Sequence, residues 1–199
     1  MKRVYFLAAL FCLFLSGCSE ITVNLSGTPT TGSGTGTNTN VSTTVPKWGT
    51  RAKTSGCVAN GALQDQQCTP GALITSATKD QICKSGYSSS VRNVPTSVKN
   101  QVYAEYSIQS HSTGQYEVDH LVSLELGGSN DISNLWPEAA SPKPGFHEKD
   151  KVENYLHDQV CSGAVSLQQA QVEVATNWLD VYNKMPSASQ SSGNGGGQP

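Results

Sequence analysis

Four residues between positions 116 and 151 combine side chains that can carry out hydrolysis: Asp119, His120, Asn134 and His147. A histidine, whose pKa lies near about 6.5, can take a proton from water at neutral pH. A divalent metal ion held by a carboxylate and an imidazole can neutralise the negative oxygens of a phosphodiester. Because adjacent residues of a strand point to opposite faces, Asp119 and His120 can serve both sides of one phosphate. The pattern therefore indicates metal-assisted hydrolysis.

The motifs around these residues resemble the HNH, or ββα-metal, endonuclease family, and within it a bacterial branch of small exported proteins. Three runs carry the resemblance, followed by His147 at a predicted helix start: Val118–Leu121 (VDHL), Gly127–Asn130 (GGSN) and Asn134–Pro137 (NLWP). A looser likeness extends from Cys68 to Trp178. The resemblance implies a two-stranded hairpin and one helix around a single divalent ion, which would be Mg²⁺, Mn²⁺ or Zn²⁺.

The same resemblance implies a role for each residue. His120 would be the general base and Asp119 a metal ligand. Asn134 would hold the loop and orient His120, with direct contact to the metal as an alternative. His147 would be the metal ligand that the helix supplies.

The chain departs from the family pattern at several positions. Ser123 stands where the motif usually has proline, and no cysteine pair flanks Asn134 and His147 to hold a structural zinc ion. Asp150 and Lys151 lie one helical turn after His147. We expect that Asp150 could complete the metal site and that Lys151 could contact phosphate.

These residues also have purely structural interpretations. His120 falls on the apolar side of the alternating segment, where a buried and hydrogen-bonded histidine is a serious alternative to a base. Asn134 can stabilise a turn, and His147 can simply begin a helix, where the helix dipole disfavours its positive form. Lys149 is expected to pair with Glu153 at i,i+4. The motifs taken together, and no single residue, favour the catalytic interpretation.

The spacing of apolar residues predicts the elements that position these groups. Alternation over 116–126 predicts extended structure, as does the short piece 134–138, and the Gly-Gly-Ser-Asn-Asp run between them predicts a turn. Capping residues and apolar stripes predict three helices, over 95–108, 146–160 and 166–182. Residues 57–94 are rich in Gly, Ser, Thr and Pro, which predicts loops with one or two short strands. The predicted fold class is α+β, with a small ββα-metal hairpin and helix supported by additional helices and a disulfide-tied loop region.

The chain contains six cysteines. Four are left in the domain if Cys12 is removed with a signal peptide and Cys18 is lipidated. None of them forms a C-x-x-C pair, and an even set in an exported protein favours disulfides over a zinc ribbon. Four cysteines allow three pairings, of which a local and a long-range bond are preferred: Cys57–Cys68 and Cys83–Cys161.

The first residues predict export to the cell envelope. A basic pair precedes an uncharged apolar run that ends at Leu15, which is typical of a signal peptide over 1–17. The Leu-Ser-Gly-Cys sequence that follows resembles a lipobox and implies acylation of Cys18, with an ordinary secretory signal as the alternative. Ser19 favours the outer membrane in the cell envelope. We expect a lipidated N-terminus and linker over 18–45, one domain over 46–185 and a disordered tail over 186–199.

Composition limits the partners. The 13 Lys and Arg residues against 15 Asp and Glu residues give a net charge of −2, with no basic run. Bulk electrostatic capture of nucleic acid is therefore not supported, although a local metal site can still bind phosphate. The expected function is that of a monomeric endonuclease that cleaves DNA, or RNA as well, in the periplasm or at the cell surface. The alternative is a non-catalytic envelope lipoprotein that keeps the ββα scaffold to bind a partner.

Overall fold

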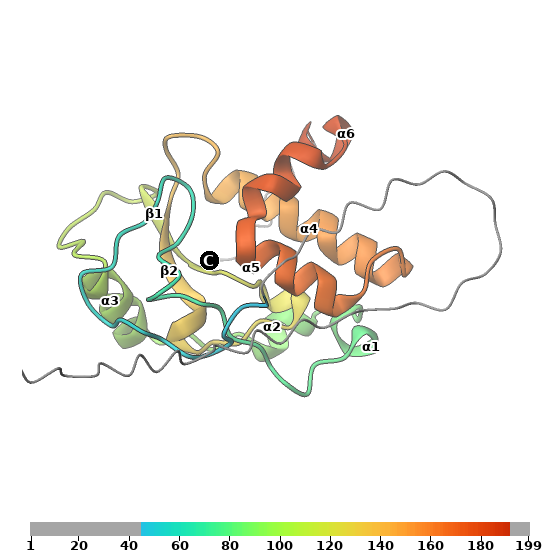
Figure 1. Cartoon of the computed structure of the whole chain (residues 1–199), viewed down its shortest axis with the longest axis horizontal. Coiled ribbons are helices and arrows are strands. Elements are labelled where there is room, and N and C mark those ends of the chain that lie inside the picture. Colours follow the sequence, from blue (N-terminus) through green and yellow to red (C-terminus); the bar gives the residue numbers. More distant parts are fainter. Residues whose placement is uncertain (1–44, 192–199) are drawn as a thin grey trace, which may run out of the picture. The chain divides into compact units, whose positions relative to one another are not determined.

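The computed structural model describes residues 45–191, which form an α+β fold of one hairpin and several helices (Figure 1). The elements in chain order are α1 (Lys79–Ile82), α2 (Tyr87–Val91), α3 (Thr96–Glu105), β1 (Tyr116–His120), the 3₁₀ turns η1 (Leu124–Leu126) and η2 (Ile132–Asn134), β2 (Leu135–Ala139), α4 (Phe146–Ser162), α5 (Leu167–Lys184) and α6 (Ser187–Ser191). The predicted signal peptide, Cys18 and the linker up to residue 44 lie outside the described residues. None of the helices within 45–191 has the length and apolar character needed to cross a membrane.

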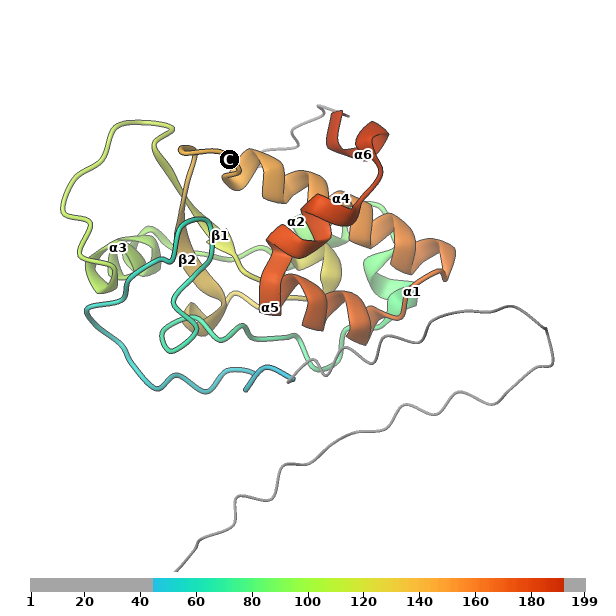
Figure 2. The ribbon, with the colours of Figure 1, turned by 45° about the horizontal axis from the view of Figure 1, so that its top comes forward.

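Strands β1 and β2 pair antiparallel and form the predicted hairpin. The register places Asp119 opposite Trp136 and His120 opposite Leu135. Pro137 lies inside β2, opposite Val118, where a two-stranded sheet tolerates its missing N–H because each strand has a free edge. In Figures 1 and 2 the hairpin lies between α3 on one side and α4 and α5 on the other.

The predicted extended segment over 116–126 is wrong beyond His120, where β1 ends. The backbone N–H and carbonyl of Val122 bond to the side chain of Asn134, at 3.0 and 2.9 Å, and not to a neighbouring strand. The chain then turns through η1, in which Leu124 and Leu126 are both buried. A tight turn thus buries apolar residues whose alternation is also typical of a strand.

The two long helices follow the predicted segments closely. Helix α4 covers Phe146–Ser162 and α5 covers Leu167–Lys184, each extending about one turn or less beyond the predicted end. Ser166 caps α5 by accepting a hydrogen bond from the N–H of Gln169 at 3.1 Å. The Gln169 side chain donates to Glu173, one turn further along α5, at 2.9 Å. The two helices pack against each other and enclose much of the core.

Residues 57–94 contain more helix than expected. Helices α1 and α2 are short, and the strand content is limited to two isolated bridges, Asn60 with Leu63 and Leu73 with Gly128. Both preferred disulfides are confirmed: Cys57–Cys68 closes a local loop, and Cys83–Cys161 joins the end of α1 to α4. The two disulfides accord with a location outside the reducing cytoplasm.

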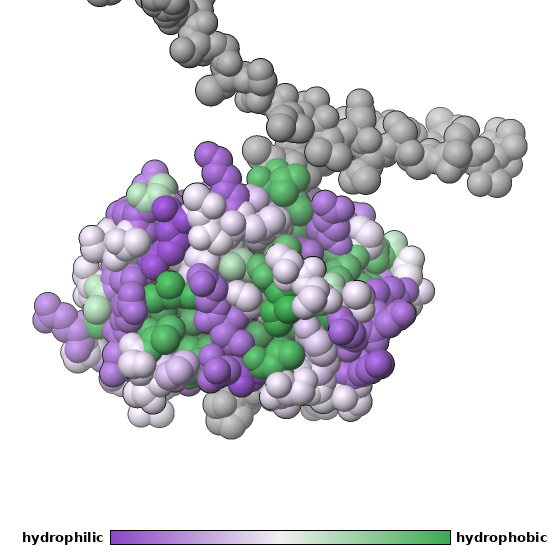
Figure 3. All heavy atoms as spheres, turned by 90° about the horizontal axis from the view of Figure 1, so that it is seen from below, coloured by the Kyte–Doolittle hydropathy of each residue, from purple (hydrophilic) through white to green (hydrophobic). Residues whose placement is uncertain are grey.

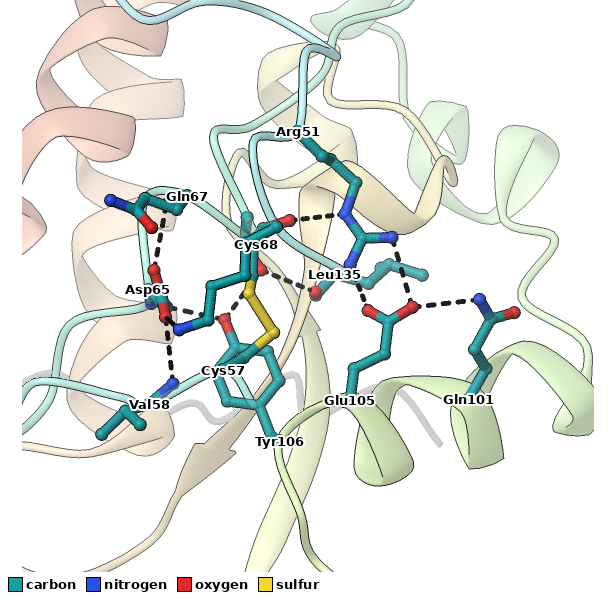
Figure 4. Close-up of a disulfide and its surroundings, with 12 residues drawn as sticks. Arg51, Cys57, Val58, Asp65, Gln67, Cys68, Gln101, Glu105, Tyr106 and Leu135 are labelled. Atoms are coloured by element: carbon teal, nitrogen blue, oxygen red, sulfur yellow. Dashed lines mark hydrogen bonds and ion pairs between the residues drawn. A yellow bond between two sulfur atoms is a disulfide. The ribbon is translucent and has the colours of Figure 1, made fainter. Parts of the chain in front are cut away.

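A disulfide closes the N-terminal loop, and an ion pair and hydrogen bonds fasten this loop to α3 and the hairpin (Figure 4). Arg51 donates to the carbonyl of Cys68 at 2.8 Å and pairs with Glu105 at the end of α3. Thr69 donates to the carbonyl of Leu135 at 3.1 Å, and its hydroxyl lies 2.8 Å from that of Tyr106. The loop therefore supports the end of β2 that faces His120.

The core lies between the hairpin, α4 and α5, and Trp136 and Trp178 are its largest members, at 1% and 0% exposed. On the face shown in Figure 3, hydrophobic patches are separated by hydrophilic side chains. The start of the predicted disordered tail is wrong, because α6 covers Ser187–Ser191; the rest of that tail lies outside the described residues. Gln190 holds this helix by donating to the carbonyls of Tyr182 and Met185, at 2.9 and 3.1 Å.

Candidate functional site

His120 is the last residue of β1 and is only 3% exposed. Its Nε2 atom lies 3.2 Å from Oδ1 of Asn130. The amide of Asn130 has one orientation, because its Nδ2 donates to the carbonyl of Val91 at 2.7 Å and its Oδ1 accepts from the N–H of Asn93 at 3.1 Å. We therefore assign the imidazole proton to Nε2, which leaves a lone pair on Nδ1.

Burial keeps the His120 imidazole uncharged. Loss of water lowers the pKa of His120 from 6.5 to about 4, although the nearby Asp119 carboxylate and the bond to Asn130 act in the opposite direction. The ring is thus a neutral hydrogen-bond donor at Nε2 and a free acceptor at Nδ1 at neutral pH. Both the predicted base and the predicted buried, hydrogen-bonded histidine are compatible with this placement.

Lys149 is a fully buried cation that joins α4 to β1. Its ammonium donates to Oδ2 of Asp119 at 2.6 Å, to the carbonyl of His120 at 2.8 Å and to Glu153. The expected i,i+4 pair with Glu153 is confirmed, and the bond to Asp119 adds a second carboxylate. Burial would raise the pKa of Asp119, but the Lys149 ammonium holds it below its usual value.

A neutral acid lies beside this ion pair. The side chain of Glu138 on β2 is 0% exposed, and its carboxyl group lies against that of Asp119, to which it donates a hydrogen bond when it is protonated. Burial, opposed by Lys149, raises the pKa of Glu138 well above its usual value, which favours the neutral acid. Burial raises the pKa of Glu153 in the same way, so the Lys149 ammonium holds Asp119 ionised in preference to the two glutamates.

Further carboxylates lie around Asp119 and act on one another. Burial and the charges of Asp119 and Asp150 raise the pKa of Glu117 to about 7. Burial and the charge of Asp119 likewise raise the pKa of Asp150, and the buried Oδ2 of Asp150 has no hydrogen-bond partner. Asp150 is therefore the predicted helix residue that the structure brings to Asp119. Glu117, two positions before Asp119 on the same face of β1, was not identified from the sequence.

Two predicted site residues make no described hydrogen bond to this group. His147 is exposed, and its ring contacts that of Phe146, with the centroids 4.2 Å apart, but its charge lowers the pKa of Asp150, so it lies within electrostatic reach of that carboxylate. Lys151 donates to the carbonyl of Gln190 in α6 at 2.8 Å, which explains why its ammonium is not directed at Asp119. The helix thus presents Lys149 and Asp150 to β1 in place of His147 and Lys151.

Asn134 is fully buried and closes the loop between the strands. Its Oδ1 accepts from the N–H groups of Ala72 and Val122, at 3.3 and 3.0 Å, and its Nδ2 donates to the carbonyls of Val122 and Ser129, at 2.9 and 2.8 Å. These four bonds use the whole capacity of the amide. The side chain therefore holds the loop, as expected, and has no lone pair left for a metal ion, while Asn130 is the residue that orients His120.

Arg92 brings an exposed positive charge close to the site. It follows α2, and its charge lowers the pKa values of both Glu117 and His120. The residues on either side of it, Val91 and Asn93, are the two that bond to Asn130. This role could not be predicted from the sequence, because an isolated arginine in a polar loop has no distinguishing pattern.

The carboxylates form an open group and not a closed metal cage. Within residues 45–191, the one set of three metal-binding side chains whose donor atoms all lie within 4.8 Å of one another is Cys83, His157 and Cys161, away from Asp119. Glu117, Asp119 and Asp150 are more widely spaced. Burial and the charge of Asp119 raise the pKa values of Glu117 and Asp150, and a bound cation would oppose both effects. No family model matches the chain, and no similar curated protein or solved structure was found.

Proposed function

We propose that the chain is a metal-dependent endonuclease that hydrolyses phosphodiester bonds in DNA, and in RNA as a second substrate. The observation that carries the proposal is the contact of the buried His120, at Nε2, with Oδ1 of Asn130, from which we assign the proton to Nε2 and a free lone pair to Nδ1. Such a group at the end of a hairpin, beside acidic residues and an exposed arginine, has the parts that phosphodiester hydrolysis needs.

In this proposal Nδ1 of His120 accepts a proton from the attacking water, and Nε2 stays bonded to Asn130. A pKa of about 4 makes the ring a weak base on its own. The negative charge of a bound phosphodiester would raise that pKa as the proton arrives, and the neighbouring Asp119 would stabilise the imidazolium. Arg92, exposed beside the site, would bind a phosphate oxygen.

Asp119, Asp150 and Glu117 would hold the divalent ion. The unpartnered Oδ2 of Asp150 and the raised pKa of Glu117 fit a cation at this position, and oxygen ligands suit Mg²⁺ or Mn²⁺ better than Zn²⁺. Such an ion, when bound, supplies positive charge to the phosphate and leaving-group oxygens. His147, one turn before Asp150, would have to turn from the surface to join it.

One observation favours the alternative of a non-catalytic partner-binding protein. The Lys149 ammonium already neutralises Asp119, which is the position that a metal ion would take. A buried cation of this kind can be a purely structural replacement for a metal. In both proposals the chain is a monomer anchored by a lipid on Cys18 in the cell envelope, with the outer membrane favoured and the domain in the periplasm or at the cell surface.

Cleavage assays on the oxidised full chain separate the two functions. We would incubate plasmid and single-stranded DNA with the chain in Mg²⁺, Mn²⁺, Zn²⁺ or EDTA. The parent would be compared with His120→Gln and with His111→Ala, which changes an exposed histidine outside the site. Metal-dependent cleavage that only His120→Gln abolishes supports the nuclease. Absence of cleavage in every metal, or equal cleavage by His120→Gln, would reject it in favour of the binding protein.

A further inference from the structure

Cys83, Cys161 and His157 bring two sulfurs and one imidazole nitrogen together on the side of α4 that faces α1. We infer that these residues form a zinc site that the Cys83–Cys161 disulfide closes and that reduction opens. The inference does not rest on the proposed nuclease, because it uses no residue of that site.

The imidazole nitrogen of His157 already lies at a zinc-ligand distance from the sulfur of Cys161, whereas the two bonded sulfurs must move apart on reduction, to about 3.8 Å for two thiolates on one tetrahedral zinc ion. His157 and Cys161 lie at i,i+4 on α4, so they share one face of the helix, and Cys83 caps the end of α1 beside them. The donor atoms of the three residues all lie within 4.8 Å of one another, and Nε2 of His157 is 3.5 Å from Sγ of Cys161. Around a tetrahedral zinc ion, with Zn–S of about 2.3 Å and Zn–N of about 2.0 Å, nitrogen and sulfur ligands are about 3.5 Å apart.

A backbone oxygen completes the shell. The carbonyl of Ile82 lies 3.1 Å from Nε2 of His157, from which it accepts a hydrogen bond. When the imidazole proton resides on Nδ1 instead, Nε2 has a lone pair for the metal, and the carbonyl or a water beside it can take the fourth position. Cys83, His157 and Cys161 are all half-buried, so a reductant and an ion can reach them.

The charge around the group favours a cation. Burial raises the pKa of the Glu125 carboxylate in η1. The positive charge of His157 opposes this rise, so the carboxylate lies within electrostatic reach of His157. A divalent ion bound to two thiolates would gain further attraction from Glu125, whereas an anion would be repelled.

Zinc binding requires two successive reactions, reduction of the disulfide and then coordination of the ion. A phosphine reductant and one water convert the disulfide into two thiols and one phosphine oxide. Each thiol then releases one proton as its sulfur binds Zn²⁺, and the imidazole keeps its single proton by moving it from Nε2 to Nδ1. Two protons are therefore released for each zinc ion bound. In the oxidised chain neither sulfur carries the thiolate charge that zinc needs, so the site is closed.

The test uses the full chain with Cys12→Ser and Cys18→Ser, so that the thiols released by reduction are those of the two disulfides. Co²⁺ replaces Zn²⁺ as a probe, because tetrahedral thiolate ligation gives it intense visible absorption and a thiolate charge-transfer band. The oxidised chain should give neither signal. The chain reduced with a phosphine should bind one Co²⁺, which one equivalent of Zn²⁺ displaces.

Two variants locate the ion. His157→Ala should weaken binding by at least about tenfold, whereas His111→Ala, at an exposed loop histidine, should leave it unchanged. Cys57→Ser with Cys68→Ser should retain the signal, which assigns it to the other pair. Circular dichroism of each oxidised variant checks its fold before reduction. No Co²⁺ spectrum on reduction, equal affinity in His157→Ala, or loss of the signal in a folded Cys57→Ser, Cys68→Ser chain would overturn the inference.

Discussion

The Nε2 atom of His120 and the Oδ1 atom of Asn130 lie 3.2 Å apart, and the same amide bonds to the backbone on both sides of Arg92. One side chain thus fixes the tautomer of the buried imidazole and the position of the nearby exposed cation. If the imidazole is a base and the guanidinium a phosphate ligand, Asn130 sets the distance between them.

Replacing Asn130 should therefore change His120 directly. Asn130→Asp places a carboxylate beside Nε2, so the pKa of His120 should rise by at least about one unit above its value of about 4. Titration of the imidazole ¹⁵N signals by NMR measures this pKa and, in the parent, should show the proton on Nε2. Asn154→Asp, at an exposed position on α4, is the matched control. An unchanged pKa in Asn130→Asp, or a proton on Nδ1 in the parent, would contradict the assignment.

The low pKa of His120 also predicts how stability depends on pH. The unfolded chain takes up this proton near about pH 6.5 and the folded chain only near 4, so stability falls as pH falls through this window, by about 3 kcal/mol in all. Glu117, whose folded pKa is raised to about 7, acts in the opposite direction. The parent should therefore be compared with His120→Gln, which retains Glu117.

Urea denaturation at several pH values makes this comparison. The free energy of unfolding of the parent, relative to His120→Gln, should decrease by about 3 kcal/mol between pH 7 and pH 4. The control is Asn154→Ala, whose difference from the parent should stay constant, because Asn154 is exposed and does not titrate. Parallel curves for the parent and His120→Gln would show that burial does not perturb the His120 imidazole.

Much of the framework follows from patterns in the sequence. The hairpin, the two long helices and both disulfide pairings were predicted, because apolar periodicity and cysteine spacing report directly on burial. The segment 121–126 was misjudged because its alternating apolar residues fit either a strand or a tight turn. The hydrogen bonds from Asn134 decide in favour of the turn, and they join residues that are 12 positions apart.

The site was predicted less completely because the rotation of α4 about its own axis decides which residues face β1. Lysine is the residue type least expected inside a protein, yet Lys149 is fully buried because three acceptors surround its ammonium. Its burial turns Asp150 toward Asp119 and leaves His147 at the surface. The sequence pattern predicts a turn at Asn130 and not its hydrogen bond to the His120 ring, because the two residues are ten positions apart and no local pattern indicates that they are in contact.

We expect Asn134 to stabilise the fold and not to take part in catalysis. Asn134→Ala leaves two N–H groups and two carbonyls without partners inside the protein, which should cost about 3–5 kcal/mol. Urea denaturation measures this loss. The matched control is Asn154→Ala, which removes one exposed bond to the carbonyl of Asp150 and should cost less than about 1 kcal/mol. Equal stability of the two variants would refute the structural role.

Lys149 gives the sharpest test of how the site is held together. Lys149→Met keeps the length of the side chain but leaves Asp119 and Glu153 buried without a cation, so we expect a loss of about 3–5 kcal/mol in the free energy of unfolding. Adding Asp119→Asn and Glu153→Gln removes the stranded charges and should recover most of the loss. Lys151→Met on the same helix, which loses one bond to Gln190, should cost less than about 1 kcal/mol.

The response of Lys149→Met to metal ions also separates the two proposed functions. If Asp119 and Asp150 can hold a divalent ion, millimolar Mn²⁺ should raise the melting temperature of Lys149→Met, because the ion neutralises the charge that the ammonium leaves behind. The triple variant, which lacks Asp119, should not respond. If Mn²⁺ stabilises neither Lys149→Met nor the parent, the Lys149 ammonium is the permanent partner of Asp119. A metal ion then cannot replace the ammonium, and this result would favour partner binding over catalysis.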